Sequence, residues 1–348
     1  MAKSLYSKDM RLNKELFLTQ LEKSIAARKL LLASDEKHLS ACRLFNGHLE
    51  SYPELVIDLY GTTALFHNFA DPPGDGDQLI QFAQSHIREQ LPWLESIVLK
   101  ERNGVTTEAK QGYLLYGEKL PTRVRENGIW YAVDLLLNQD ASFYLDTRNA
   151  RHWLAKNSAE QSMLNTFAYT GSLGVAAQAG NASRVVHTDL NRRFLNMAKT
   201  SYTLNGYPIH KRDFQTGDFF PQVNRLKRES ERFDCVILDP PFFSSTDHGT
   251  VDMATDSVRL INKLRPLVKD GGRIIAINNA LYLSGADYMN TLQSLCKNGF
   301  VEVEEIIPVP EDITGYPHTI QLDPVSDPAP FNHSTKIVVL RIFHNHRP

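Results

Sequence analysis

The stretch that decides the fold is LNTFAYTGSLGVAAQAGNASRVVHTDL, residues 164–190. An apolar run ends at residues 167–169, a turn with Gly171 and Gly174 follows, and small residues continue as a short helix over 175–179. A second apolar run, Val185 and Val186, ends close to Asp189. Strand, glycine turn, helix, strand and carboxylate in this order predict an α/β unit that binds the nucleoside part of a cofactor.

The glycine spacing indicates which nucleoside cofactor is bound. A GxGxxG pattern brings backbone against a pyrophosphate, but GSLG at 171–174 lacks the middle glycine. S-adenosylmethionine has no pyrophosphate, so the stretch favours it over NAD. An ordinary βαβ unit whose glycines only make a tight turn is the alternative interpretation.

A second motif, FDCVILDPPF at residues 233–242, reads as a buried strand that ends in Asp239, Pro240, Pro241 and Phe242. It resembles the motif by which many class I methyltransferases hold the group to be methylated. The prolines fix the backbone, so Asp239 is expected to face a pocket as an acceptor while Phe242 stacks on a flat substrate. Simple termination of the strand by two prolines is the alternative.

Composition bounds the class of protein. A chain of 348 residues can hold more than one core, and 42% hydrophobic with 22% charged residues is ordinary for a soluble protein. No apolar run approaches the roughly 20 residues of a membrane span, so a cytoplasmic protein is expected. Three cysteines without ligand spacing predict neither disulfides nor a metal. With a net charge of −2, any RNA-binding surface must be local.

Local patterns divide the chain into three predicted parts. Residues 1–42 carry apolar positions at helical spacing among Lys and Arg, which indicates either a solvated helix face or an RNA contact. Residues 43–137 contain short β-like runs, one helix and the hairpin signal Asn127-Gly128, and predict a small α+β lobe that could bind RNA. Residues 138–348 predict the catalytic domain.

Helices and strands alternate after Asp189. Helices are predicted over 191–204 and 251–268, a strand over 273–277, and a final antiparallel pair over 301–307 and 336–343. This alternation predicts an α/β, Rossmann-like class I methyltransferase domain beside the smaller N-terminal lobe. The proline-rich connection 308–333 is too long for a turn and reads equally as a substrate lid or a structural wrap.

Several motifs in order resemble one family. They are RLF at 43–45, PELVIDLY at 53–60, LKER at 99–102, GEK at 117–119, FYLDTR at 143–148 and NTFAYTG at 165–171. Together they resemble the 23S ribosomal RNA methyltransferases that act on cytosine C5 or guanine N7. The resemblance covers most of the chain and implies 23S rRNA as the partner. The residues before the small lobe are expected to be too few for the PUA domain of the cytosine branch.

The resemblance and the glycine pattern together assign cofactor contacts. Asp189 is expected at the ribose and Asp213 with Phe214 at the adenine, with Asp218 as the competing acid for that place. Arg148 is expected either to pair with the methionine carboxylate or to form a surface salt bridge. The expected cofactor residues are Phe143, Asp146, Arg148, Asn165, Phe167, Tyr169, Thr170, Gly171, Asp189, Leu190, Asp213, Phe214 and Asp239.

The positions of the cysteines indicate which atom of the substrate receives the methyl group. Methylation at cytosine C5 needs a thiolate that adds to C6, but Asn278-Asn279 stands where the cytosine branch has its cysteine. Cys235 and Cys296 read as core residues, so nitrogen methylation is predicted, with guanine N7 as the target. A methyltransferase for a small aromatic metabolite or a protein, and a binding protein without turnover, are the alternatives. The expected catalytic residues are Asp239, Pro240, Pro241, Phe242, Asn278 and Asn279.

Overall fold

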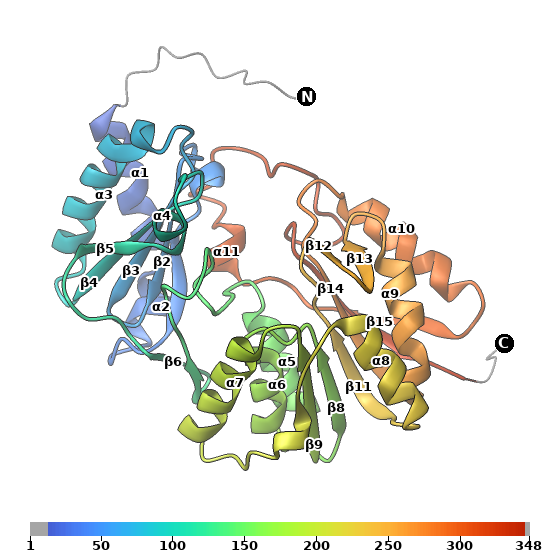
Figure 1. Cartoon of the computed structure of the whole chain (residues 1–348). Helices are drawn as coiled ribbons and strands as arrows, with labels where there is room; N and C mark the ends of the chain where they lie inside the picture. Colours follow the sequence, from blue (N-terminus) through green and yellow to red (C-terminus); the bar gives the residue numbers. More distant parts are fainter. Residues whose placement is uncertain (1–12, 345–348) are drawn as a thin grey trace. The chain divides into compact units, whose positions relative to one another are not determined.

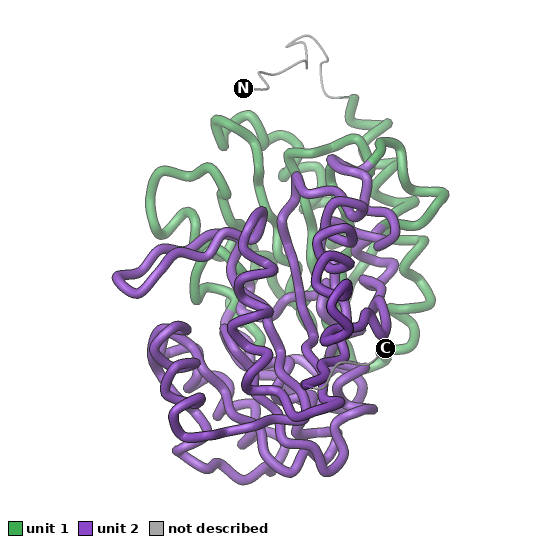
Figure 2. The backbone as a smooth tube through the Cα atoms, turned by 90° about the vertical axis from the view of Figure 1, so that its right-hand side faces the viewer, with its two compact units in different colours: residues 1–121, 135–140, 315–323 green, residues 122–134, 141–314, 324–348 purple. Residues whose placement is uncertain are grey.

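The computed structural model describes residues 13–344, and these form two compact units (Figure 2). Of the described residues, unit 1 contains 13–121, 135–140 and 315–323. Unit 2 contains 122–134, 141–314 and 324–344. The chain therefore passes between the units more than once, and each unit is assembled from segments that are distant in sequence.

Unit 1 is built on a five-stranded sheet in the order β1-β2-β3-β4-β5. Adjacent strands of this sheet are antiparallel except β3 and β4. These two are parallel, and helix α3 connects them. This is the predicted α+β lobe. Its elements are α1 (Lys14–Ala27), α2 (Lys29–Ala33), β1 (Ala41–Phe45), η1 (Gly47–Glu50), β2 (Leu55–Tyr60), β3 (Thr63–Asn68), η2 (Pro73–Gly76), α3 (Asp77–Gln90), β4 (Ser96–Glu101), α4 (Thr107–Gln111) and β5 (Tyr113–Tyr116).

The predicted N-terminal helix is part of the core of unit 1. Phe17, Leu21 and Ile25 of α1 are buried in one apolar cluster with strands β1 to β4. Arg28, at the break between α1 and α2, is fully buried and lies 3.6 Å from Glu50. The apolar side of α1 therefore packs as the helical spacing predicts, whereas Arg28 is buried and does not lie on the solvated face predicted for the cations.

Unit 2 carries a seven-stranded sheet in the order β10-β9-β8-β11-β14-β16-β15. Strands β8 to β11 and β14 are parallel neighbours, and β16 joins antiparallel to β14 and β15. This is the predicted Rossmann-like arrangement with its terminal antiparallel pair. The strands are β8 (Ser162–Thr166), β9 (Arg184–Asp189), β10 (Phe214–Thr216), β11 (Phe233–Leu238), β14 (Val268–Asn278), β15 (Val301–Ile306) and β16 (Lys336–Ile342).

Helices cover both faces of this sheet. Figure 1 shows α5, α6 and α7 grouped on one side and α8, α9 and α10 on the other. The central strands are apolar on both faces, as buried parallel strands must be. The helices and turns are α5 (Arg148–Asn157), α6 (Ser172–Ala179), α7 (Arg192–Leu204), η3 (Lys211–Asp213), α8 (Phe219–Arg228), α9 (Ser257–Leu264), η4 (Arg265–Leu267), α10 (Gly285–Cys296) and α11 (Glu311–Thr314).

One helix prediction is wrong at its beginning. Residues Phe243–Thr246 (β12) and Gly249–Asp252 (β13) form a hairpin, and helix α9 begins only at Ser257. The buried Val251, expected on the helix, faces inward from β13 instead. A β-branched residue at one buried position fits either element, so periodicity alone does not separate them.

The unit boundaries also differ from those predicted. The hairpin of β6 (Arg123–Glu126) and β7 (Ile129–Ala132) has the expected Asn127-Gly128 turn but belongs to unit 2. Its backbone is held there because Trp130 N–H and Ala132 N–H donate to Asn205 and Ser201 of α7 and its cap. Residues 315–323 of the long connection return to unit 1. Helices long and apolar enough to cross a membrane are not found among residues 13–344.

Candidate active site

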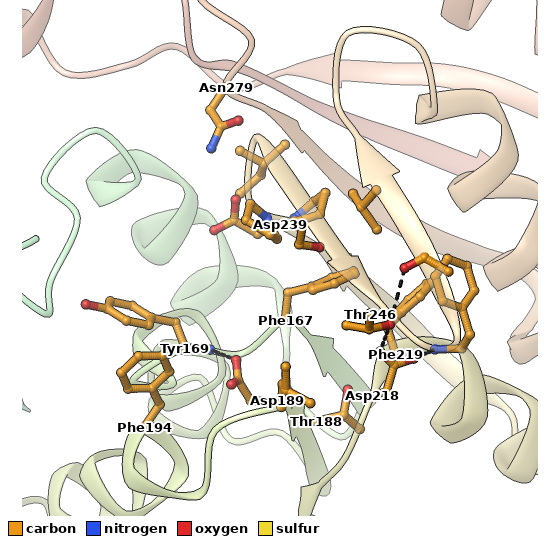
Figure 3. Close-up of a pocket in the computed structure, with 18 of the residues that line it drawn as sticks. Phe167, Tyr169, Thr188, Asp189, Phe194, Asp218, Phe219, Asp239, Thr246 and Asn279 are labelled. Carbon is orange, nitrogen blue, oxygen red and sulfur yellow. Dashed lines mark hydrogen bonds between the residues drawn. The ribbon is translucent and has the colours of Figure 1, made fainter. Parts of the chain in front are cut away.

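A pocket opens at the carboxyl-terminal ends of the parallel strands of unit 2 (Figure 3). Residues after β8, β9, β10 and β11 line it, which is the edge where open α/β sheets bind ligands. The hairpin β12–β13 and the approach to β16 complete the wall. The lining residues are Tyr144, Asp146, Thr147, Phe167, Tyr169, Thr188, Asp189, Leu190, Phe194, Gly217, Asp218, Phe219, Phe220, Asp239, Pro240, Pro241, Ser244, Ser245, Thr246, Gly249, Val251, Ile277, Asn279 and Thr335.

The turn after β8 has a compact, left-handed backbone. Phe167, Tyr169 and Gly171 have φ values of 50°, 51° and 79°. At Gly171 an added Cβ would lie 2.5 Å from the Cβ of Ala198, so both the backbone angle and the space require glycine there. Two non-glycine residues in this region are energetically costly, which is typical of ligand-binding turns. Phe167 and Tyr169 line the pocket, whereas Gly171 starts α6 behind it.

Asp189 lines the pocket at the end of β9, the place where a ribose acceptor is expected. One carboxylate oxygen accepts a hydrogen bond from the N–H of Tyr169 at 2.7 Å, and the other accepts one from the N–H of Asn191 at 2.8 Å. Burial raises the pKa of Asp189 while these two hydrogen bonds oppose the rise. Each oxygen keeps a lone pair for a hydroxyl group, and Leu190 beside it is 63% exposed at the pocket wall.

The acid that lines the pocket beyond β10 is Asp218. It caps α8 by accepting from Phe220 N–H at 2.9 Å, and it accepts from the Thr246 hydroxyl at 2.7 Å (Figure 3). Asp213, the acid that the sequence favours here, does not line the pocket and pairs with Arg184 at 2.8 Å. The reason is that Asp213 precedes β10, at the amino-terminal end of the strand, whereas the pocket is at the other end.

Phe214 likewise lies outside the pocket. It is buried in β10, and its ring stacks on His187 at 4.9 Å between centroids. The apolar wall beside Asp218 comes from Phe219, which stacks on Phe167 at 4.6 Å, and from Phe220. Sequence reasoning missed these two aromatics, although their position directly after Asp218 could have indicated them.

Asp239 occupies the centre of the pocket at the end of β11. Within residues 13–344 its carboxyl group has no hydrogen-bond partner, whereas the neighbouring Asp146 accepts from the hydroxyl of Thr335 at 2.7 Å. Burial, reinforced by the negative charge of Asp146, raises the pKa of Asp239 to about 7. Asp239 is therefore balanced between its charged and neutral forms near neutral pH.

The remaining predicted catalytic residues divide into two groups. Pro240, Pro241 and Asn279 line the pocket. Phe242 does not line it but is 49% exposed. Asn278 is fully buried and donates to the carbonyl of Met253 at 2.8 Å, so it supports the loop before α9 and does not face the pocket.

Besides Gly171, Asp213 and Phe214, four more predicted cofactor residues do not line the pocket. Arg148 pairs with Asp312 at 2.7 Å, which is the salt-bridge alternative, although this pair is largely buried. Phe143 lies under the guanidinium of Arg151, and Thr170 donates to the carbonyl of Ser142 at 2.6 Å. Asn165 lies within β8 and contacts His187 at 3.4 Å. None of the four is among the lining residues.

Residues that the sequence did not single out complete the lining. Tyr144 and Phe194 flank Tyr169, with ring centroids 5.4 and 4.5 Å from it. Thr335 arrives from the far end of the long connection, and Ser244 to Thr246 arrive on the unpredicted hairpin. Tyr144 lies inside the FYLDTR motif, so its neighbours in sequence could have indicated that it lines the pocket. No sequence motif indicated the same for Thr335.

Comparison with known proteins identifies the family. Residues 43–314 match the model of the S-adenosylmethionine-dependent methyltransferase family. The chain belongs to this family. Four carboxylates and no Lys, Arg or His line the described pocket, and this acidic lining fits a cofactor that carries a sulfonium and an ammonium group. The cofactor of this methyltransferase is S-adenosylmethionine.

Similar proteins include ribosomal RNA methyltransferases. It is 30% identical over 251 residues to ribosomal RNA large subunit methyltransferase I of Tolumonas auensis, covering 69% of this chain and 60% of that protein. It is 29% identical to ribosomal RNA large subunit methyltransferase K/L of Colwellia psychrerythraea, covering 76% of this chain and 37% of that protein. The match therefore spans less than two thirds of the length of either relative.

A solved structure shares the fold. SMU.776, a protein assigned as a methyltransferase and crystallised with SAH, superposes with a TM-score of 0.82 at 24% identity. The superposition covers 96% of this chain and 83% of that chain. The shared fold thus includes the segments of both units.

Proposed function

We propose that this methyltransferase modifies a base nitrogen of 23S ribosomal RNA, with guanine N7 as the target atom. Two kinds of observation support an RNA base as the substrate. The relatives are named as large-subunit ribosomal RNA methyltransferases. The pocket offers what a flat base requires, namely acceptors at Asp239 and Asn279 and aromatic rings at its wall.

The observation that carries nitrogen methylation is the position of the thiols. None of the three cysteines lines the pocket. Cys235 is fully buried inside β11, and burial raises the pKa of its thiol to about 12. Such a thiol stays protonated and cannot add to a pyrimidine ring, which methylation at cytosine C5 requires. A ring nitrogen already has a lone pair and needs only positioning.

The pocket residues then have defined tasks. The bound cofactor supplies an electrophilic methyl group on its sulfonium. Asp189 holds the ribose and Asp218 accepts from the adenine amino group. Pro240 and Pro241 fix the backbone so that Asp239 meets the incoming base. Methylation at guanine N7 moves the positive charge from sulfur to the purine without releasing a proton, and the ionised Asp239 stabilises that charge on the base side.

The deciding experiment is nucleoside mass spectrometry of ribosomal RNA from cells with and without the gene. We expect one 7-methylguanosine per 23S rRNA to disappear when the gene is deleted and to return when it is restored. Restoring the gene with Asp239→Ala is expected to leave the position unmethylated. Loss of 5-methylcytidine instead, or full methylation by the Asp239→Ala variant, would refute the proposal.

Incubation in vitro separates the RNA substrate from other substrate classes. Purified protein with labelled S-adenosylmethionine is offered total RNA, protein extract and metabolite extract separately. We expect label only in the RNA. Label in the metabolite or protein pool would replace the proposed substrate, and binding of the cofactor without label in any pool would indicate a protein without turnover.

A further inference from the structure

Helices α8 and α9 carry a concentration of positive charge that the pocket does not use. Residues 219–232 and 257–267, which contain these helices with the turns that follow them, hold seven Lys or Arg and only two Glu. This contrasts with the whole chain, whose net charge is −2. The seven cations are Arg225, Lys227, Arg228, Arg232, Arg259, Lys263 and Arg265.

The two glutamates do not neutralise the centre of this surface. Glu229 lies 3.6 Å from Arg225, and Glu231 lies 3.0 Å from Arg184 on β9. Glu229 therefore neutralises Arg225, and Glu231 is paired with an arginine that lies outside the two helices. The nearest acid that precedes α9, Asp256, is paired with Arg259 at 2.8 Å.

Five of the seven cations have no acidic partner in the described part of the chain. Among residues 13–344, Lys227, Arg228, Arg232, Lys263 and Arg265 make no ion pair, and Lys263 donates a hydrogen bond of 3.2 Å to Asn224. Three of the five, Lys227, Arg232 and Lys263, interact with one another through their charges. The pKa of Lys227 is lowered by partial burial and, in addition, by the charges of Lys263 and Arg232. We name Lys227, Arg232 and Lys263 the basic triad.

The basic triad connects to the wall of the pocket through Phe220. The ring of Phe220 lines the pocket, and the charged groups of Arg259 and Lys263 lie 5.3 and 5.5 Å from its centroid. Arg259 also donates to the carbonyl of Thr250 in the hairpin β12–β13. Positive charge therefore extends from the rim of the pocket across α9 to α8, and Figure 1 shows these two helices side by side.

Like charges gathered without acids repel one another and cost stability, unless an anion completes the surface. A polyanion whose repeating charges follow the surface fits better here than a single small anion, because the cations lie on two helices and lead toward the pocket. An RNA strand whose base occupies the pocket has this chemistry.

We propose that the α8–α9 surface binds the phosphodiester backbone of the substrate RNA beside the methylated nucleotide. This inference rests on the proposed RNA substrate and adds a second anchor to the RNA contacts predicted for residues 1–137. Contacts to phosphates carry no sequence information but fix the register of the strand. The basic triad thus positions the RNA, while Asp239 and Asn279 meet the base.

The test compares wild type with a variant carrying Lys227→Gln, Arg232→Gln and Lys263→Gln. A 23S rRNA fragment that contains the methylated site is titrated at several salt concentrations, and cofactor affinity is measured by calorimetry. Each phosphate contact to single-stranded RNA contributes about 0.7 to the slope of log K against log salt, so the slope should weaken by about 2. Relative to the affinities at 1 M salt, the RNA affinity of the variant near 0.1 M salt should then fall on the order of 100-fold below that of wild type, while cofactor affinity is retained.

A matched control removes three exposed cations from elsewhere in unit 2. Lys156→Gln, Arg212→Gln and Lys297→Gln lie on α5, η3 and the end of α10 and change the net charge by the same amount. This control should leave the slope within about 0.5 of wild type. An equal loss of slope in both variants would show that only net charge matters and would overturn the proposal.

The outcomes also separate this inference from the proposed function. If wild type neither binds nor methylates the RNA, the proposed function fails. If wild type methylates the RNA and the basic-triad variant binds it with unchanged slope, the surface is not an RNA anchor. If the triple variant loses cofactor binding, the same titration is made with the single variant Lys227→Glu. For that variant, a slope of log K against log salt equal to the wild-type slope would refute the inference.

Discussion

Two carboxylates of the same pocket, Asp189 and Asp239, illustrate two ways of placing an acid beside a ligand. Asp189 is the last residue of parallel strand β9, Asp239 directly follows parallel strand β11, and burial raises the pKa of both. Asp189 accepts two backbone hydrogen bonds that hold its orientation and favour its charged form. Asp239 has no such partner among the described residues and faces the second acid Asp146, so its pKa reaches about 7.

Under the proposed function, the difference separates two tasks. Asp189, assigned to the ribose, is fixed in advance by backbone donors. Asp239, assigned to the base, has no such partner, so its charge responds to what binds next to it. The following predictions test this contrast, from the largest expected effect to the smallest.

The largest effect is expected for Asp239→Ala. Removing a positioned charge that acts on the base side should lower kcat by about 10²-fold to 10³-fold. The Kd for S-adenosylmethionine should rise by only about fivefold at neutral pH, because the ribose and adenine contacts remain and only the charge of Asp239 is lost. Single-turnover methylation of the rRNA fragment and calorimetry measure the two effects. A large rise in Kd with unchanged kcat would assign Asp239 to cofactor binding.

Asp189→Ala should show the opposite pattern. The variant loses a charged acceptor for ribose hydroxyls, and such hydrogen bonds contribute about 1.5–3 kcal/mol, so the cofactor Kd should rise about tenfold or more. Asp189→Asn keeps an oxygen acceptor and is the matched control, with a smaller rise. Equal affinity of wild type and Asp189→Ala in calorimetric titration would remove Asp189 from this role.

Cofactor affinity should rise with pH because of Asp239. A bound cation favours the ionised carboxylate, so the pKa of Asp239 in the complex lies below its value of about 7 in the free protein. Binding therefore releases a proton below pH 7, and affinity should increase about fivefold from pH 6 to pH 8 before levelling off. The Asp239→Asn variant should show a flat profile. A flat wild-type profile would contradict the raised pKa.

The smallest effect is expected for Asp218→Asn. Both carboxylate oxygens of Asp218 already accept protein hydrogen bonds, from Phe220 N–H and the Thr246 hydroxyl. An amide oxygen can still cap α8, so the cofactor Kd should rise by only about twofold to threefold. Asp213→Asn, outside the pocket, is the control and should not alter Kd. A larger effect for Asp213 than for Asp218 would reverse the assignment of the adenine end.

The sequence by itself determined the framework of the site. The order of strand, glycine turn, helix, strand and acid between residues 164 and 190 is a local pattern, and parallel strands bring the residues after them to one edge. This pattern is sufficient to place Phe167, Tyr169 and Asp189 at this edge, and the strand motif at 233–242 places Asp239 there. Each residue ends its strand or follows it by only a few residues, which leaves little freedom in its position.

Only the tertiary structure decided which of several nearby polar residues face the pocket. The choice between Asp213 and Asp218 depended on which end of the three-residue strand β10 meets the ligand. Thr335 directly precedes β16, and it reaches the site because β16 pairs with β14, a strand that is distant from it in sequence. Arg148 turns to Asp312 because that buried acid, 164 residues away, needs a counter-charge. Such choices depend on long-range packing, which local sequence patterns do not encode.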